Sequence, residues 1–181
     1  GYTKDATPDL TLGAAGADSM RFQVNAEGWG LWLPYAASKT DLSISGSGEG
    51  YKQVYVEYKD KAGNSAAVIS DSTTYDTTAP SLLSLAITDN QGFTNDSTPT
   101  LALGAAGADS MAFKLNGGAW SPYYPFGTAD SSFSIAAGGD GLKKISVKFR
   151  DKAGNVTSGL LADSTMYDAT IPTVAITSSR T

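Results

Sequence analysis

A pentapeptide that occurs twice constrains this chain more than any other feature. The stretch from Asp60 to Asn64 (Asp-Lys-Ala-Gly-Asn) returns unchanged from Asp151 to Asn155, an offset of 91 residues (151 − 60). An alternation of apolar and polar residues precedes each copy, which places every second side chain on one face of a strand. Gly and Asn tolerate the positive φ of a tight turn. Each pentapeptide is therefore predicted to join the last two strands of a small β unit.

The repeat extends over almost the whole chain. Residues 1–64 align with residues 92–155 without a gap, and nearly half of the aligned positions are identical. Units of about 90 residues can each bury a modest core. We predict a first repeat at residues 1–79, whose first strand has no counterpart in the sequence, and a second repeat at residues 80–171. Residues 172–181 are predicted to begin a further repeat or a linker.

The fold class follows from the spacing of the strand and turn signals. Short alternating segments are separated by turn residues every 8–12 positions, and no segment has a helical period. The prediction is an all-β chain with two tandem immunoglobulin-like β-sandwich domains. Leu42 with Ile44, and their counterparts Phe133 with Ile135, are expected to form a short strand in each unit.

Composition excludes several classes of function. The net charge is −5, and no basic cluster is present to neutralise phosphates, so nucleic acid is not expected as a partner. The chain has no Cys and no His, which removes the common nucleophile and the common general base, and we expect no enzyme. No apolar run reaches the ~20 residues of a membrane span. No lysine is expected at a buried strand position, which argues against an internal Lys–Asn cross-link.

The given sequence is out of frame with the repeat by about one strand. Residues 80–88 form a good first strand for the second repeat, and residues 172–177 resemble the opening strand of a third. Two explanations stay open. The favoured one is a fragment of a longer array; in the other, a terminal strand fills the open edge of another unit by β-strand addition.

Two motifs carry a resemblance to a known family. The stretch from Val54 to Asn64, followed by Tyr75 to Pro80, is similar to the bacterial Ig-like repeats of large surface proteins and adhesins, and residues 92–101 look like the start of such a repeat. The resemblance implies tandem arrays at a bacterial cell surface or in a secreted protein, with neighbouring repeats as partners and calcium at domain junctions in many members. The stretch Trp120 to Tyr123 looks more like modules that accompany secreted enzymes.

Calcium, the cofactor that the resemblance implies, needs six to eight oxygen ligands gathered from several loops. At the end where the chain enters the second unit, the candidate ligands are Asp76, Asp109, Asp151 and Asn155. At its other end they are Asp89, Asn90, Asp96 and Asp168. The corresponding groups of the first unit are Asp5 with Asp76 and Asp18 with Asp60 and Asn64. The competing interpretation is that these are ordinary turn residues, whose side chains bond to nearby backbone. A metal is expected first at the second pentapeptide.

An aromatic segment in each unit permits a different function. Exposed aromatic side chains on one face could stack against sugar rings of a cell-surface glycan. The candidate residues are Trp32, Tyr35, Tyr123 and Tyr124. Trp29 and Trp120, at matched positions, are expected to be core instead. The sequence thus predicts an extracellular spacer, with a glycan-binding module or an accessory domain of a secreted hydrolase as alternatives.

Overall fold

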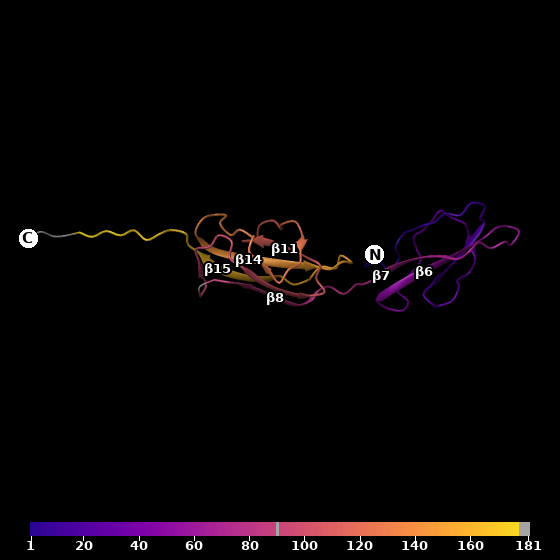
Figure 1. Ribbon diagram of the computed structural model, residues 1–181, viewed down its shortest axis with the longest axis horizontal. Coiled ribbons are helices and arrows are strands. Elements are labelled where there is room, and N and C mark those ends of the chain that lie inside the picture. Colours follow the sequence, from indigo (N-terminus) through magenta and orange to yellow (C-terminus); the bar gives the residue numbers. More distant parts are fainter. Residues whose placement is uncertain (90, 178–181) are drawn as a thin grey trace, which may run out of the picture. The chain divides into compact units, whose positions relative to one another are not determined.

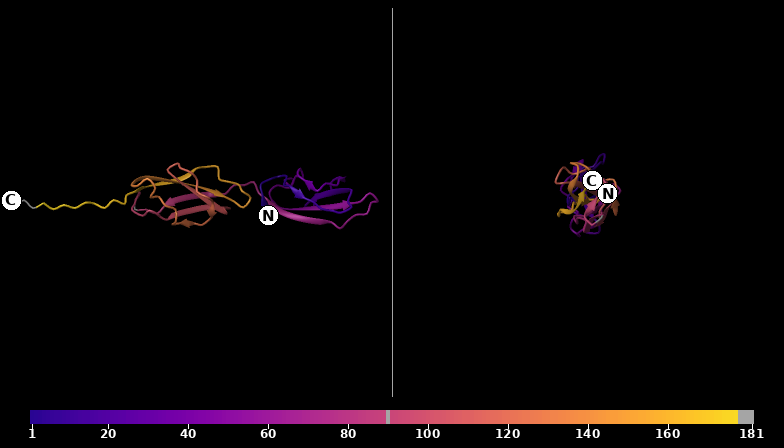
Figure 2. Two further views of the ribbon diagram at one scale, coloured as in Figure 1. Left: turned by 90° about the horizontal axis from the view of Figure 1, so that it is seen from above. Right: turned by 90° about the vertical axis from the view of Figure 1, so that its left-hand side faces the viewer.

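The computed structural model describes residues 1–89 and 91–177, and it forms two compact units (Figures 1 and 2). The first is built mainly from Gly1–Thr78 and the second mainly from Ala79–Asp151 and Val156–Thr181. All regular elements among the described residues are β-strands, so none of them forms a helix able to cross a membrane. The all-β prediction is confirmed.

Unit 1 is a sandwich of a five-stranded and a two-stranded sheet. The larger sheet has the order β1-β7-β6-β3-β4, and the smaller pairs β2 with β5. In Figure 1, β6 and β7 run side by side along the unit. The strands are β1 (Tyr2–Thr3), β2 (Leu10–Thr11), β3 (Ser19–Val24), β4 (Leu33–Pro34), β5 (Ser38–Lys39), β6 (Gly50–Lys59) and β7 (Ile69–Tyr75).

Unit 2 repeats this arrangement with one strand more. Its larger sheet has the order β12-β11-β14-β15-β9, and its smaller sheet, β13-β10-β8, has three strands. The strands are β8 (Ser81–Ile87), β9 (Phe93–Thr94), β10 (Leu101–Ala106), β11 (Ser110–Leu115), β12 (Tyr124–Pro125), β13 (Ala129–Asp130), β14 (Gly141–Arg150) and β15 (Leu161–Tyr167). The additional strand is β8, the first strand of the unit.

The core of each unit comes from the alternation that the sequence displays. In β6, Val54, Val56 and Tyr58 point inward and are buried, and the inward residues of β3 pair with them across the ladder. The corresponding positions of β11 and β14 form the core of unit 2. Because the period of a strand is two, one face of each central pair of strands closes on the smaller sheet.

The pentapeptide forms a tight turn, as predicted, but positive φ occurs at its Gly and not at its Asn. Gly63 has φ of 92° and Gly154 has φ of 88°, whereas Asn64 does not adopt positive φ. Asn64 instead donates from its backbone N–H and its amide nitrogen to the Asp60 carboxylate, both at 2.8 Å. The glycine therefore supplies the backbone conformation, and in the first copy the asparagine holds the turn closed.

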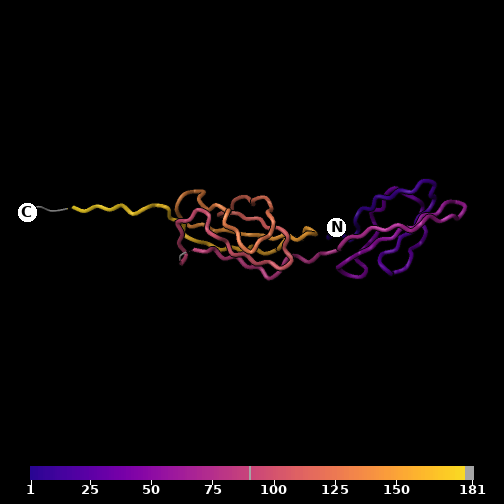
Figure 3. The backbone as a smooth tube through the Cα atoms, in the orientation of Figure 1, coloured from indigo at the N-terminus to yellow at the C-terminus, as the bar shows by residue number. Residues whose placement is uncertain are grey.

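One strand prediction, made for both units, is wrong in detail. Residues 42–44 and 133–135 lie outside any strand, although Ile44 and Ile135 are buried. Each is fixed by one backbone hydrogen bond instead of a ladder, from Ile44 to Ala6 and from Ile135 to Ser97. Residues 172–177, which are predicted to begin a further repeat or a linker, belong to no strand: Figure 3 shows them as an extended segment, and no backbone partner pairs with them among the described residues. Their role stays a prediction. The remaining residues of the predicted segment, 178–181, lie outside the described part of the chain.

The expectation that no lysine occupies a buried strand position is also wrong. Lys52 in β6 and Lys143 in β14 are only 1% and 2% exposed. Each continues the inward alternation of its strand, and its ammonium group reaches the glycine-rich loop at the end of the sandwich. Lys52 Nζ donates to Ser47 Oγ at 2.6 Å, and Lys143 Nζ donates to the Ala137 carbonyl at 2.7 Å. The argument against a Lys–Asn cross-link therefore fails, but both ammonium groups already have oxygen partners.

Candidate functional sites

A carboxylate from the glycine-rich loop holds the segment that leaves unit 1. Glu49 accepts hydrogen bonds from the Thr77 backbone N–H at 2.6 Å and from the Thr77 hydroxyl. The Thr78 hydroxyl donates to the second carboxylate oxygen at 2.9 Å. This cluster, the unit 1 exit clamp, fixes the two residues that come after Tyr75-Asp76.

Unit 2 carries the same device at the matched position. Asp140, which aligns with Glu49, accepts from the Ala169 backbone N–H at 2.9 Å and from the Thr170 hydroxyl at 2.5 Å. This cluster is the unit 2 exit clamp. Sequence reasoning missed both clamps, although an acidic residue recurs within the glycine-rich loop and a threonine recurs shortly after each Tyr-Asp pair.

The pKa of each clamp carboxylate is lowered, which favours its charged form. The hydrogen bond from the Thr77 hydroxyl is the main cause that lowers the pKa of Glu49 below its ordinary value. For Asp140, the backbone N–H of Ala169 is the main cause that lowers the pKa. Hydrogen bonds to an ionised carboxylate favour that form. The clamps therefore work with charged carboxylates at neutral pH.

Several of the predicted metal ligands act as turn residues. Asp76 accepts from the Thr78 backbone N–H at 2.9 Å, and Asp168 accepts from the Thr170 backbone N–H at 3.0 Å. Asp96 accepts from the backbone N–H of Thr98 at 2.8 Å. These are the short-range bonds typical of Asx turns. Each carboxylate still has a second oxygen, so the turn role and a ligand role are compatible.

One end of unit 2 brings two predicted ligands to the same hollow. Asp89 and Asp168 line an open hollow of about 530 Å³ together with Asn95 and the threonines 88 and 94. Asp89 also accepts from the Gly92 backbone N–H at 3.1 Å. Asp96 does not line this hollow, and Asn90 lies outside the described residues. This end therefore offers two carboxylates, one amide oxygen and two hydroxyls.

The other end of each sandwich holds the pentapeptide turn. In unit 1, Asp18 comes beside the turn, because its Oδ2 accepts from the Lys61 backbone N–H at 2.9 Å. In unit 2, the backbone of Asp109 bonds to the strand that leads into Asp151 and Asn155. Over residues 1–89 and 91–177, no group of three or more acidic side chains is placed to hold a metal ion. The arrangement of these residues with Asp76 stays a prediction.

The aromatic residues of unit 1 form a row with cations on the outer face of the larger sheet. The Arg21 guanidinium lies 4.9 Å from the ring centroid of Trp29 and 4.7 Å from that of Trp32. Lys59 Nζ lies 4.1 Å from the Trp32 centroid. Arg21 is itself paired with Glu57 at 2.6 Å. Such cation–π contacts position the rings over outward-facing side chains of β3 and β6.

Unit 2 has a corresponding row with different cations. Lys114 and Lys148 lie 4.8 Å and 4.6 Å from the Trp120 centroid. Lys148 and Arg150 lie 5.0 Å and 4.0 Å from the Tyr123 centroid. Tyr124, the remaining candidate of this unit, is exposed and belongs to no such contact among the described residues.

The expectation that Trp29 and Trp120 are core is wrong. Both rings are half-buried and lie outside the two core clusters. The core aromatic residue of this segment is Tyr35, which packs edge-on against Tyr58 with 6.1 Å between the ring centroids. In unit 2, Phe126 packs in the same way against Phe149. Both indoles lie over cationic side chains of the larger sheets instead. Tyr35 therefore serves packing, while Trp32 and Tyr123 remain candidates for ligand contact.

Comparison with solved structures supports the fold. The fibronectin(III)-like modules of Clostridium thermocellum CbhA match with a TM-score of 0.57 over 98% of this chain and 95% of theirs, at 11% identity. A tetra-tandem repeat from the extending region of a large adhesion protein matches with a TM-score of 0.38 at 17% identity. A Ca²⁺-stabilised adhesin of an ice-binding Antarctic bacterium matches with a TM-score of 0.32 at 18% identity.

The chain covers 47% and 42% of those two adhesin chains. No protein-family model and no curated protein sequence matches it. The structural likeness to the fibronectin(III)-like modules places both units in the immunoglobulin-like class of β-sandwich, which confirms the predicted fold class.

Proposed function

We propose that this chain is a structural spacer of a tandem-repeat protein outside the cell, with neighbouring repeats as its partners. The observation that carries the proposal is the duplication of the exit clamp along with the core. Glu49 and Asp140 both hold the segment through which the chain leaves their unit. A spacer needs held connections, because domains on a free linker move independently. A catalytic or binding site would not require that every unit repeat this clamp.

Measuring the distance between spin labels on the two units tests this function. Glu49→Ala removes the acceptor for Thr77 and Thr78, so the distance distribution should broaden. Asp140→Ala is the matched control, because it releases only the segment after unit 2 and should leave that distribution unchanged. An unchanged distribution in Glu49→Ala would contradict the spacer role of the clamp.

We further propose that calcium stiffens the ends of the units. One ligand set is Asp76 with Asp109, Asp151 and Asn155, and the other is Asp89 with Asp96 and Asp168. Support comes from the hollow that Asp89 and Asp168 share with Asn95, which gathers the hard oxygen donors that calcium prefers. Calcium that binds only the folded state would add ~2.7 kcal/mol at a hundredfold excess over Kd.

Thermal unfolding in calcium and in chelator tests the metal. We expect a higher melting temperature in calcium, and a smaller shift in the double variant Asp89→Asn, Asp168→Asn. Glu27→Gln, at an exposed acidic position that belongs to neither ligand set, should keep the full shift. Identical melting curves with and without calcium would remove the metal from the proposal and leave the spacer role in place.

Glycan binding is the second candidate function, and the aromatic rows favour it. Trp32 and Tyr123 are half-buried and are positioned by cations, which is the kind of rigid ring a sugar can stack on. Binding to a glycan array that is lost in Trp32→Ala or Tyr123→Ala would support this role. An array without hits would contradict it. An accessory role beside a secreted hydrolase would use the same two units, and the full-length gene tests it.

A further inference from the structure

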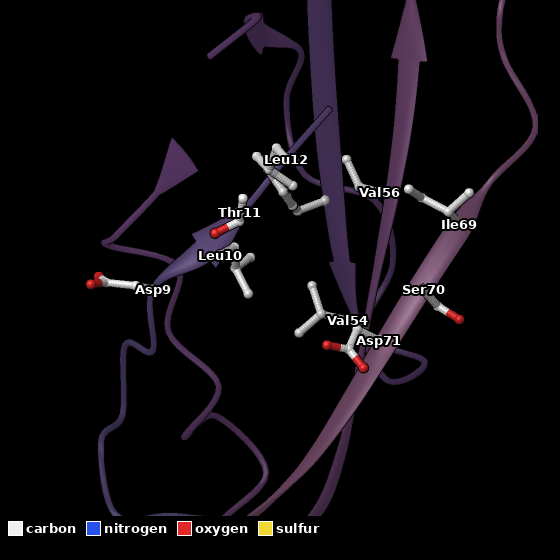
Figure 4. A pocket seen from close by; sticks show the side chains of 10 residues that line it. Asp9, Leu10, Thr11, Leu12, Val54, Val56, Ile69, Ser70 and Asp71 are labelled. Atoms are coloured by element: carbon white, nitrogen blue, oxygen red, sulfur yellow. The ribbon is translucent and has the colours of Figure 1, made fainter. Parts of the chain in front are cut away.

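The outer faces of the two larger sheets carry opposite charges at one matched position. In unit 1, Figure 4 shows Val54 and Val56 of β6 on the side that faces Leu10 of the smaller sheet. Successive side chains of a strand point to opposite faces, so Glu57 points to the outer face. The matched residue of unit 2 is Lys148, between the buried Val147 and Phe149. An ammonium group thus takes the place of a carboxylate in the central strand of unit 2.

In unit 1 this carboxylate largely neutralises the outer face. The charged residues at outward positions of β3 and β6 are Arg21, Glu57 and Lys59. Glu57 lies 2.6 Å from the guanidinium of Arg21 and also accepts from its Nε at 2.7 Å. One cation of this face, Lys59, is left without a carboxylate partner among the described residues.

In unit 2 the outer face is strongly basic. The outward positions of β11 and β14 carry four cations and no carboxylate: Lys114, Lys144, Lys148 and Arg150. Over residues 1–89 and 91–177, no ion pair joins any of them to an acidic side chain. The whole chain has a net charge of −5, so its remainder carries −9 (−5 − 4). A concentrated positive face on an acidic chain attracts anionic ligands selectively. The sequence conceals this cluster, because its members come from two strands that are distant in the chain.

Two aromatic rings lie between three of these cations. Lys114 and Lys148 lie 4.8 Å and 4.6 Å from the ring centroid of Trp120. Lys148 and Arg150 lie 5.0 Å and 4.0 Å from that of Tyr123. Cations and rings therefore alternate along the row, and both rings are half-buried, so part of each is open to solvent. We call the four cations and the two rings the basic face of unit 2.

The chemistry of the basic face suits a sugar that carries a carboxylate. Exposed parts of Trp and Tyr rings offer an apolar surface with a polar edge, on which a sugar ring can stack. Ammonium and guanidinium groups are donors without acceptor capacity, so they favour an anionic oxygen. A guanidinium that lies over a ring, as that of Arg150 does, keeps N–H donors at its edge for a carboxylate.

We infer that the basic face of unit 2 binds an acidic polysaccharide of the uronic-acid class. Sugar rings stack on Trp120 and Tyr123, and the carboxylates of the polymer pair with Lys114, Lys148 and Arg150. Unit 1 does not share this site, because Glu57 repels a carboxylate at the matched place. The inference rests on the glycan-binding candidate of the proposed function, and it adds the class of glycan and the unit that binds it.

The same observations favour a polysaccharide over a nucleic acid. Affinity for nucleic acid comes mainly from neutralising phosphates, and every nucleotide carries one. Four cations on a chain that is otherwise acidic serve that purpose poorly. The alternation of cations and rings instead matches a polymer in which each unit has one stacking ring and one carboxylate. A site outside the cell, where we propose that this chain acts, also gives access to such polymers.

Affinity electrophoresis of the whole chain in gels with different polymers tests the inference. Polygalacturonate should retard the chain, and rising salt should weaken the retardation because it screens the charges. Its methyl-esterified form has the same sugar rings without the charge and should retard the chain much less. Polyglutamate has carboxylates without sugar rings, and single-stranded DNA has phosphates and bases. Neither should retard the chain as strongly as polygalacturonate.

Charge exchange between the units gives the sharpest variants. Lys148→Glu installs the residue that unit 1 tolerates at this position, so the chain should fold, and its affinity for polygalacturonate should fall by about tenfold or more. Glu57→Lys should raise the affinity, because it removes the repulsion in unit 1. Lys61→Glu is the matched control: it changes the net charge by the same amount as Lys148→Glu, but in an exposed turn of unit 1, and should bind like the wild type.

The outcomes separate this inference from the proposed function. Equal retardation by the methyl-esterified polymer would overturn the acidic class and leave a glycan-binding module. Retardation by polyglutamate or DNA as strong as by polygalacturonate would overturn the sugar-stacking role of the rings. An unchanged affinity in Lys148→Glu would overturn the site itself. If no polysaccharide retards the chain, both the inference and the glycan-binding candidate fail, and the spacer role remains.

Discussion

Unit 1 and unit 2 have nearly the same core sequence but not the same degree of closure. Leu101 is fully buried in unit 2, whereas its counterpart Leu10 is only half-buried. Ile69 is 53% exposed, although its counterpart Leu161 packs against the core of unit 2. The difference arises from β8, which covers these positions in unit 2 alone. A repeat of this kind therefore completes its sandwich with a strand that precedes the repeated sequence.

The largest expected effect is on core burial. Leu101→Ala should lower the free energy of unfolding of unit 2 by about 2–5 kcal/mol, because it leaves a cavity in a closed core. Leu10→Ala should lower that of unit 1 by less than half as much, since part of this side chain is already exposed. Chemical denaturation with a tryptophan signal for each unit measures both values. Equal losses would contradict the difference in closure between the two units.

A smaller effect is expected at the carboxylate that bonds to β8. Asp163→Ala leaves the buried N–H of Ile87 without its acceptor and should cost unit 2 about 1–3 kcal/mol. Asp71→Ala, at the matched position of unit 1, should change that unit by less than about 0.5 kcal/mol, as surface substitutions usually do. The difference between the free-energy losses of these two variants, measured by urea denaturation, isolates the contribution of the hydrogen bond between Asp163 and β8. A similar cost in both would contradict the role assigned to Asp163.

The tryptophan rows should give a still smaller difference between the units. Trp120 contacts two cations and Trp29 contacts one, and neither ring belongs to a core cluster. Each tryptophan→Ala variant should lose about 0.5–2 kcal/mol, with the larger loss in unit 2. A loss of about 3–5 kcal/mol, which is typical of a core tryptophan, would restore the interpretation made from sequence.

The smallest effect is the pH dependence of the exit clamps. Their folded-state pKa values lie below the ordinary values of 4.5 for Glu49 and 3.8 for Asp140. A depressed pKa contributes stability that is complete above the unfolded value and is lost as the pH falls through the folded value. The amide signals of Thr77 and Ala169 should therefore titrate below pH 4.5 and below pH 3.8, respectively. A midpoint above those values at either clamp would contradict its geometry.

The sequence predicted the fold well because its signals are local. Period-two alternation in β6 and β14, and the repeated glycine turn, depend only on residues within one hairpin. The same alternation places Lys52 and Lys143 at inward positions. No buried lysine is expected there from sequence, because lysine is rarely buried. Their long side chains can follow the core and still bring the ammonium group to an oxygen at its end.

The candidate sites were harder to predict, because side-chain roles depend on segments far apart in the chain. Trp29 is a large aromatic residue of the kind expected in a core, and only its contact with Arg21 on the larger sheet shows that it faces outward. Glu49 is one acidic residue in a loop until the fold brings Thr77 beside it. Asp89 and Asp168 were predicted to approach one another, and the structure does bring them to one hollow. Calcium binding at this hollow stays a prediction.

By itself the sequence determined the architecture: a duplicated all-β unit with two sandwich cores, because alternation and turn chemistry act over a few residues. The sequence also indicates that the first repeat lacks a counterpart of the strand at residues 80–88, but only the tertiary structure shows which side chains that strand covers. Leu10 and Leu101 occupy matched positions, but their burial depends on whether another strand pairs beside them. Strand pairing is a long-range interaction, so the local sequence of a repeat cannot specify what covers its edge.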